Sequence, residues 1–119
     1  MRRIDPEPLS VWWADVKLEK IRGGERYISE DSFKRPVVFI DNEAYLVFKM
    51  TSRERDGYVI KGLSEAGLMK RFIIRTDVIV PISRGDLIHR LGQLSERDSF
   101  GLLEHLNDAQ TPRMMGEDG

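Results

Sequence analysis

Residues 33–52, FKRPVVFIDNEAYLVFKMTS, contain two short apolar runs separated by a polar turn, and no other pattern in the chain constrains the fold as strongly. Residues 35–40 are apolar on both strand faces after the first residue, which predicts a central strand. Pro36 fits only near the start of that strand, because it cannot donate a backbone hydrogen bond. Residues 41–43 predict a turn, and residues 44–51 predict the returning strand. A tight β-hairpin follows, in which the first strand begins where the second one ends.

Further β-rich segments flank the hairpin. A strand is expected over residues 10–18, a short one over 58–62 and another near 90–94. Residues 70–82 predict a long strand that is bent near Thr76-Asp77 and ends near Pro81. Residues 19–34 contain Gly23-Gly24 among many charges, and they predict a long loop of the kind that is often functional.

The end of the chain predicts one helix. Ser95-Glu96-Arg97-Asp98 is similar to a capping box with Asp in place of Glu. The helix is expected over residues 96–107, with Phe100, Leu103 and Leu106 on one stripe. Residues 108–119 show no periodicity and are expected to be a disordered tail, while residues 1–9 form a polar lead-in. The prediction is a mainly β domain over residues 10–107, a small antiparallel barrel with a C-terminal helix.

Composition excludes several function classes. The 119 residues include 19 Lys and Arg against 20 Asp and Glu, so the net charge of −1 gives no overall attraction to nucleic acid. The absence of cysteine excludes a disulfide scaffold and thiolate chemistry. No apolar run approaches the ~20 residues of a membrane span. We therefore expect a soluble cytoplasmic protein without a membrane partner. We also expect neither a cofactor nor a metal site.

The hairpin places Arg35 and Thr51 at the same end of the sheet, within side-chain reach of each other. We expect the loop over residues 19–34 to bring Glu30 and Lys34 to this end. A guanidinium grips phosphate oxygens in a planar fork, and a hydroxyl beside it can hydrogen-bond developing negative charge. This combination suits a phosphodiester.

Several motifs in this order resemble the MazF/PemK/Kid family of toxin endoribonucleases. The matching pieces are VWWADV, Glu30 five positions before Arg35, RPVVFI, the strand-ending MTS, IIRTD at residues 73–77, and HRLGQLSERD at residues 89–98. The resemblance covers about residues 10–107. It implies an SH3-like barrel, a homodimer, neutralisation by a cognate antitoxin, and sequence-specific, metal-independent cleavage of single-stranded RNA. In that reaction the ribose 2′-hydroxyl attacks the adjacent phosphate.

The resemblance also implies residue roles. The catalytic set it implies is Arg35, Thr51, Arg75 and Asp77. Expected RNA contacts are Glu30, Lys34, Ser52, Lys70 and Arg71. Arg35 stays protonated and is expected to stabilise charge, while the proton acceptor is Asp77 or Glu30.

Two pairs of residues and one alternative function remain to be described. Trp12 and Trp13 point to opposite strand faces, which predicts one core and one surface or interface tryptophan. His89 and His105 are expected to be structural or solvated. The alternative function is a silent or CcdB-like binding module on the same barrel, acting on a protein partner.

Overall fold

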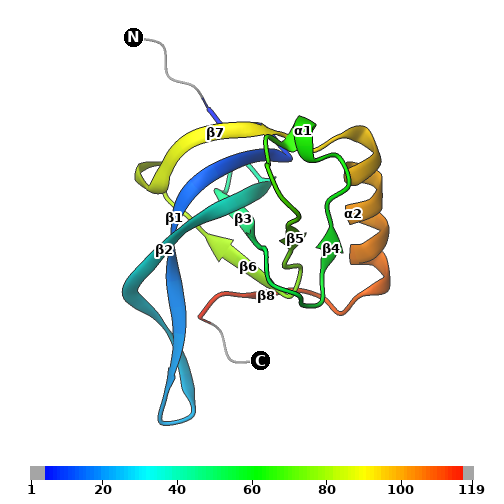
Figure 1. Cartoon of the computed structure of the whole chain (residues 1–119). Helices are drawn as coiled ribbons and strands as arrows, with labels where there is room; N and C mark the ends of the chain where they lie inside the picture. The colour runs from blue at the N-terminus through cyan, green and yellow to red at the C-terminus, as the bar shows by residue number, and fades with distance from the viewer. Residues whose placement is uncertain (1–4, 117–119) are drawn as a thin grey trace.

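The computed structural model describes residues 5–116, and it shows a curled, mostly antiparallel sheet with one long helix against it (Figure 1). The strands are β1 (Ser10–Arg22), β2 (Glu25–Asp41), β3 (Leu46–Thr51), β4 (Tyr58–Val59), β5 (Ile73–Ile74), β6 (Val78–Pro81), β7 (Leu87–Gln93) and β8 (Arg113–Met114). The helices are α1 (Leu63–Ala66), the 3-10 turn η1 (Arg84–Asp86) and α2 (Glu96–Asp108). The predicted mainly β class is confirmed, and the arrangement fits a small SH3-like barrel.

The path of the sheet explains where the candidate site forms. Its strand order is β4-β5-β3-β2-β1-β7, and β6 also pairs with β3. The outer edge of β3 is therefore shared, with Met50 and Thr51 facing β5 and Leu46 and Val47 facing β6. The chain between β5 and β6 breaks at residues 75–77, as expected from the sequence. That break lies beside the middle of β3, because the Arg75 backbone N–H donates to the Lys49 carbonyl at 2.9 Å.

Both faces of the central strands are buried. On one face Val38, Phe48 and Ile74 pack with residues of α1 and α2. On the other face Val37 and Phe39 pack with residues of β1 and β6. This arrangement agrees with the continuous apolar run from which a central strand was predicted.

The returning strand of the hairpin begins later than predicted. Residues 42–45 form the turn, and β3 starts at Leu46 rather than at Ala44. Tyr45 adopts a left-handed conformation with φ of 56°, which a β-strand cannot contain. Its ring packs edge-on against Phe39, with the ring centroids 5.7 Å apart.

The predicted loop over residues 19–34 is wrong, because these residues extend β1 and β2 into a long hairpin (Figure 1). Gly23 and Gly24 have φ of 59° and 81° and form the two-residue turn that right-handed strand twist favours. Pairing continues to Arg22 opposite Glu25, with one irregularity between Lys17 and Glu19. The hairpin projects beyond the rest of the sheet.

The expectation of a disordered tail is also wrong for residues 109–116, while residues 117–119 lie outside the described residues. This C-terminal segment runs from α2 along β6, where β8 pairs in parallel. The Met115 side chain is buried with the β6 residues. The Arg113 guanidinium donates two hydrogen bonds to the Glu19 carboxylate, one of them at 2.7 Å. A short segment without periodicity is thus held by contacts with residues far away in sequence.

Helix α2 begins as predicted, and of its predicted apolar stripe only Leu106 packs against the core. The Ser95 hydroxyl accepts from the Asp98 backbone N–H at 3.1 Å. The fully buried Asp98 carboxylate accepts from the Tyr58 hydroxyl at 2.8 Å and from two backbone N–H groups of residues 61 and 62. Leu102 is the buried leucine, whereas the predicted stripe residues Phe100 and Leu103 are 61% and 58% exposed.

The described part of the chain contains no helix that could span a membrane. None of the helices between residues 5 and 116 combines the length and the apolar character needed to cross a bilayer.

Candidate functional site

Arg35 and Thr51 lie together, as the hairpin register predicted. Val37 pairs with Lys49 across β2 and β3, so continuing this register places Arg35 opposite Thr51. Both residues line a groove of about 410 Å³. We call this the phosphate groove, and its lining residues are Trp13, Lys34, Arg35, Pro36, Met50, Thr51, Ser52, Arg53, Lys70 and Phe72.

The hydroxyl of Thr51 is available to an anion. Its oxygen accepts a hydrogen bond from the Arg53 backbone N–H at 3.1 Å. Its own hydrogen can then donate to an oxygen of a ligand in the groove. The turn after β3 therefore fixes the oxygen and leaves the O–H free to donate.

Positive side chains gather on one face of β2 and β3. Val37 faces Lys49 across the strand pair, and Arg35 lies on the same face as Val37 because side chains alternate along a strand. Arg35 and Lys49 therefore share this face. The break between β5 and β6 adds Arg75 beside Lys49. We call Arg35, Lys49 and Arg75 the cationic cluster.

The charges of the cationic cluster are incompletely compensated. Lys49 is only 7% exposed, and no hydrogen bond or ion pair reaches its ammonium from residues 5–116. Burial, together with the charges of Arg75 and Arg35, lowers the pKa of Lys49 to about 8. Burial and the Arg75 charge also lower the pKa of Arg35.

Two donors of the cluster also lack partners. The Nε atoms of Arg35 and Arg75 are buried, and neither has a hydrogen-bond acceptor in the described part of the protein. A buried donor without an acceptor is destabilising, as are like charges held close together. Both features favour binding of an anion, which would supply acceptors and opposite charge.

Asp77 lies in a second pocket, which adjoins the cationic cluster through Arg75. The Arg75 guanidinium donates to the Asp77 carboxylate at 3.0 Å, and Arg55 lies 3.8 Å from it. Burial opposes ionisation of Asp77, but the hydrogen bond and charge of Arg75, aided by Arg55, produce a net lowering of its pKa. Asp77 is therefore ionised at neutral pH.

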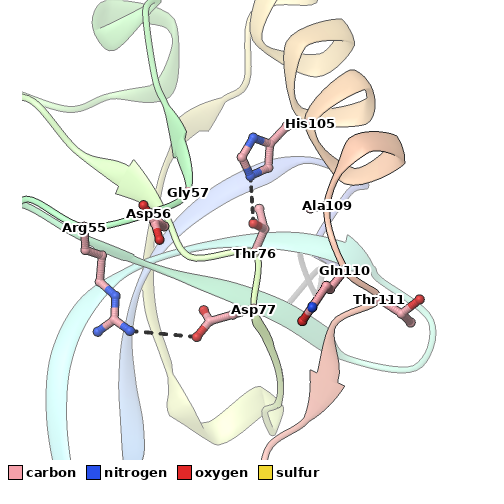
Figure 2. A pocket seen from close by; sticks show the side chains of 9 residues that line it. All are labelled: Arg55, Asp56, Gly57, Thr76, Asp77, His105, Ala109, Gln110 and Thr111. Carbon is pink, nitrogen blue, oxygen red and sulfur yellow. Dashed lines mark hydrogen bonds and ion pairs between the residues drawn. The ribbon is translucent and has the colours of Figure 1, made fainter.

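We call this second pocket the side pocket, and Figure 2 shows it. Its volume is about 660 Å³, and its lining residues are Arg55, Asp56, Gly57, Thr76, Asp77, His105, Ala109, Gln110 and Thr111. His105, expected to be structural or solvated, lies in its wall with Nε2 3.1 Å from the Thr76 hydroxyl. The sequence pattern predicted neither that His105 lines a pocket nor that residues 109–111 complete it.

The other predicted site residues divide into two groups. Lys34, Ser52 and Lys70 line the phosphate groove with Arg35. Arg71 is outside it, and its guanidinium pairs with Glu54 at 2.9 Å. Glu30 lies on the projecting hairpin, about 16 Å along the strand from Arg35, and pairs with Lys17 at 3.7 Å. The expectation that a loop brings Glu30 to the Arg35 end is wrong, because that loop is an extended strand.

Lys49 is the site residue that sequence reasoning missed. Its position in VFKMT shows a lysine on the same strand face as the buried Val47. That pattern could have indicated a buried cation, since lysine is almost never fully buried without a partner. Among residues 5–116, no three His, Asp or Glu side chains gather as a metal site would require.

A scan against profiles of known protein families finds no match, and no curated protein matches the chain.

Proposed function

We propose that the protein is a cytoplasmic endoribonuclease toxin of the MazF/PemK/Kid type, which cleaves single-stranded RNA at short sequences without a metal ion. The observation that carries this proposal is the cationic cluster, in which the buried Nε atoms of Arg35 and Arg75 have no hydrogen-bond acceptor among residues 5–116, and the buried side chain of Lys49 has no ion pair there. A phosphodiester supplies both the negative charge and the acceptors that these groups lack. The motif order read from the sequence supports RNA as the source of this phosphodiester.

In the proposed reaction the ribose 2′-oxygen forms a bond to phosphorus and the bond from phosphorus to the 5′-oxygen breaks. The products are a 2′,3′-cyclic phosphate and a free 5′-hydroxyl. Arg35 and Arg75 stabilise the charge that develops on the non-bridging oxygens, and Thr51 donates to one of them. The proton of the 2′-hydroxyl moves to a protein base, and water supplies a proton to the 5′-oxygen.

Asp77 is the proposed proton acceptor, because Glu30 lies too far along the hairpin. Asp77 is ionised, although its lowered pKa makes it a weak base. Lys49 also lies close by and exchanges a proton near neutral pH, because its pKa is about 8. The proposed role of Lys49 is to add positive charge behind the phosphate when it is protonated.

The phosphate groove also contains groups that suit the rest of an RNA strand. Lys34 and Lys70 extend its positive charge beyond Arg35. Trp13 and Phe72 provide aromatic surface on which bases can stack without strong sequence preference. Trp13 is half-buried, whereas Trp12 is a core residue, as the alternation along β1 predicted.

The test of this proposal is cleavage of several long single-stranded RNAs in the presence of a chelator. We expect discrete fragments that end in cyclic phosphate. Arg35→Ala should lower the rate by about 10²–10³, because it removes a charge that stabilises the transition state. Arg97→Ala, which removes an exposed arginine of α2, is the matched control and should cleave normally. Intact RNA with folded wild-type protein on every substrate would overturn the proposal.

A second candidate is a CcdB-like binding module that acts on a protein partner. The observation that favours it is the apolar side of α2, where the exposed Phe100 and Leu103 and the half-buried Leu106 border a hollow of about 300 Å³. This candidate predicts that Arg35→Ala retains full toxicity, whereas Phe100→Ser loses it. Growth inhibition by the two variants therefore separates the candidates.

The proposal includes two protein partners, a second copy of the chain and a cognate antitoxin. Growth inhibition that is relieved by co-expressing the product of a short neighbouring gene would support the antitoxin. The same gene should not relieve inhibition by an unrelated ribonuclease.

A further inference from the structure

The side pocket contains groups that phosphate binding does not explain. A phosphate would be repelled by the ionised Asp77 carboxylate, although Arg55 and Arg75 compensate for part of that charge. The pocket also presents an uncharged amide from Gln110 and a hydroxyl from Thr76. A ligand that offers both hydrogen-bond donors and acceptors would satisfy these groups, in contrast to the ligand of the phosphate groove.

Asp77 retains the ability to bind a donor. A carboxylate accepts about four hydrogen bonds, and the Arg75 guanidinium donates one of them, at 3.0 Å. In Figure 2 the Gln110 side chain extends across the pocket toward Asp77, whereas the Thr111 hydroxyl points away from it. An acceptor and an amide thus face the same space from opposite sides.

The C-terminal segment holds Gln110 at the pocket. The Arg113 backbone N–H donates to the Asp77 carbonyl at 3.1 Å, and the Met115 backbone N–H donates to the Ile79 carbonyl at 2.8 Å. Arg113 is further fixed by its two hydrogen bonds to Glu19. The pocket wall over residues 109–111 is therefore anchored on both sides, by α2 and by β8.

The position of the pocket connects it to the phosphate groove. Arg75 hydrogen-bonds to Asp77 in the side pocket, and its charge lowers the pKa of Arg35 at the groove. A nucleotide whose phosphate lies on the cationic cluster would have its neighbouring base within reach of the side pocket. Unstacked bases of single-stranded RNA are read through hydrogen bonds on their edges.

We infer that the side pocket binds one unstacked nucleobase of the RNA and that Gln110 reads its hydrogen-bonding edge. This inference rests on the RNA-cleaving function proposed above. Gln110 determines which base is accepted at one position beside the cleaved phosphate. The segment that follows α2 is thus part of the substrate site.

Cleavage-site mapping on several long RNAs provides the first test. For wild-type protein, sequencing of the fragment ends defines the base preference at each position. Gln110→Ala should still cleave. At one position of the cleavage site we expect its preference for one base over the others to fall about tenfold, because one base-edge contact is removed. Asn107→Ala is the matched control, since this exposed amide of α2 does not line the pocket.

Side-chain amide signals in NMR spectra provide a readout that a merely structural role would not change. The chain has two glutamines, Gln93 and Gln110, and two asparagines, Asn42 and Asn107. The probe is a hexanucleotide of the mapped sequence in which a 2′-deoxy sugar at the cleavage site prevents reaction. Titration should shift the Gln110 amide and leave the Asn42 and Gln93 amides in place.

The outcomes distinguish this inference from the proposed function. If wild-type protein cleaves RNA while Gln110→Ala keeps the same base preferences and the Gln110 amide does not shift, the base-binding inference is overturned and the ribonuclease remains. If wild-type protein neither cleaves nor binds any RNA, both are overturned. A relaxed preference at one position together with a shifted Gln110 amide supports the inference.

Discussion

Lys49 combines two roles that oppose each other. A lysine buried between Arg35 and Arg75 without an ion pair destabilises the folded chain. The same charge favours an anion on the cationic cluster. Stability and ligand binding are therefore expected to change in opposite directions when this residue is replaced, as at many functional sites.

Lys49→Met should raise the free energy of unfolding at pH 7 by about 1 to 3 kcal/mol, because it removes a buried charge and keeps apolar volume. The pKa of Lys49 is about 8 in the folded protein against 10.5 as its ordinary value. The unfolded chain thus binds more protons between pH 8 and 10.5, so wild-type stability rises relative to the variant across this range. Urea titrations at pH 7 and pH 10 measure the difference.

The matched control for this prediction is Lys17→Met, which replaces a half-exposed lysine. It should change stability little and show no such pH dependence. A Lys49→Met variant that is less stable than wild type at pH 7 would contradict the account of Lys49 as a destabilising buried cation. RNA binding by Lys49→Met should be weaker even though its fold is more stable.

At the scale of elements, the C-terminal segment and the long hairpin hold each other in place. Glu19 lies near the irregularity between β1 and β2. Its carboxylate accepts hydrogen bonds from the Arg113 guanidinium and from the Gly116 backbone N–H. The hydrogen bond from Arg113, supported by Gly116 and by nearby positive charge, lowers the pKa of Glu19 to about 2 despite partial burial. One carboxylate therefore connects β1 to β8.

Glu19→Gln should lower the free energy of unfolding at neutral pH by about 1 to 3 kcal/mol, because a charge-assisted pair is lost. The folded pKa of about 2 lies below the ordinary value of 4.5. The contribution is thus present above pH 4.5 and is lost as the pH falls toward 2. Thermal or urea unfolding of both proteins at pH 7 and pH 3 measures it.

Glu43→Gln, at an exposed position in the turn before β3, is the control and should leave stability unchanged at both pH values. Hydrogen exchange gives a second readout for Glu19→Gln. The Arg113 amide, which donates to the Asp77 carbonyl, and the Met115 amide, which donates to the Ile79 carbonyl of β6, should exchange faster in the variant. Unchanged exchange at these amides would show that Glu19 does not hold the segment.

For the whole molecule, the net charge of −1 requires that any attraction to RNA be local. Binding to a non-cleavable RNA should weaken with salt in proportion to the few phosphates held in the groove. With about three to four phosphate contacts, the slope of log K against log salt should be about −2 to −3 for a single strand. Arg35→Ala should reduce the slope by about 0.7. A slope near zero would contradict a phosphate groove.

Assembly is the other prediction at this scale. We expect a homodimer, because an open sheet leaves strand edges that a second copy can cover. Exposed Phe100 and Leu103 on α2 provide apolar surface for such a contact. Light scattering at micromolar concentration should report twice the chain mass of 13.8 kDa. A monomer at that concentration would contradict the prediction.

Local sequence patterns were sufficient to predict much of the fold and the pairing of Arg35 with Thr51 in the candidate site. The hairpin of β2 and β3 followed from two apolar runs and a turn, and its register placed Arg35 beside Thr51. The start of α2 followed from Ser95 and Asp98. In the long β1–β2 hairpin, Gly23-Gly24 between alternating residues was a usable signal, but the high charge of that segment favoured a loop. These features depend on neighbouring residues or on one strand pair, so a short stretch of sequence is enough to specify them.

By itself, then, the sequence determined the central hairpin of β2 and β3, which of its side chains share a strand face, and that Arg35 and Thr51 meet. Only the tertiary structure decided that Lys49 lies buried between two arginines, that Asp77 faces a separate pocket, and that residues 109–116 complete that pocket. The physical reason is that strand alternation and hairpin register act over a few residues, whereas burial, charge repulsion and the pairing of Arg113 with Glu19 depend on segments up to 94 residues apart in sequence.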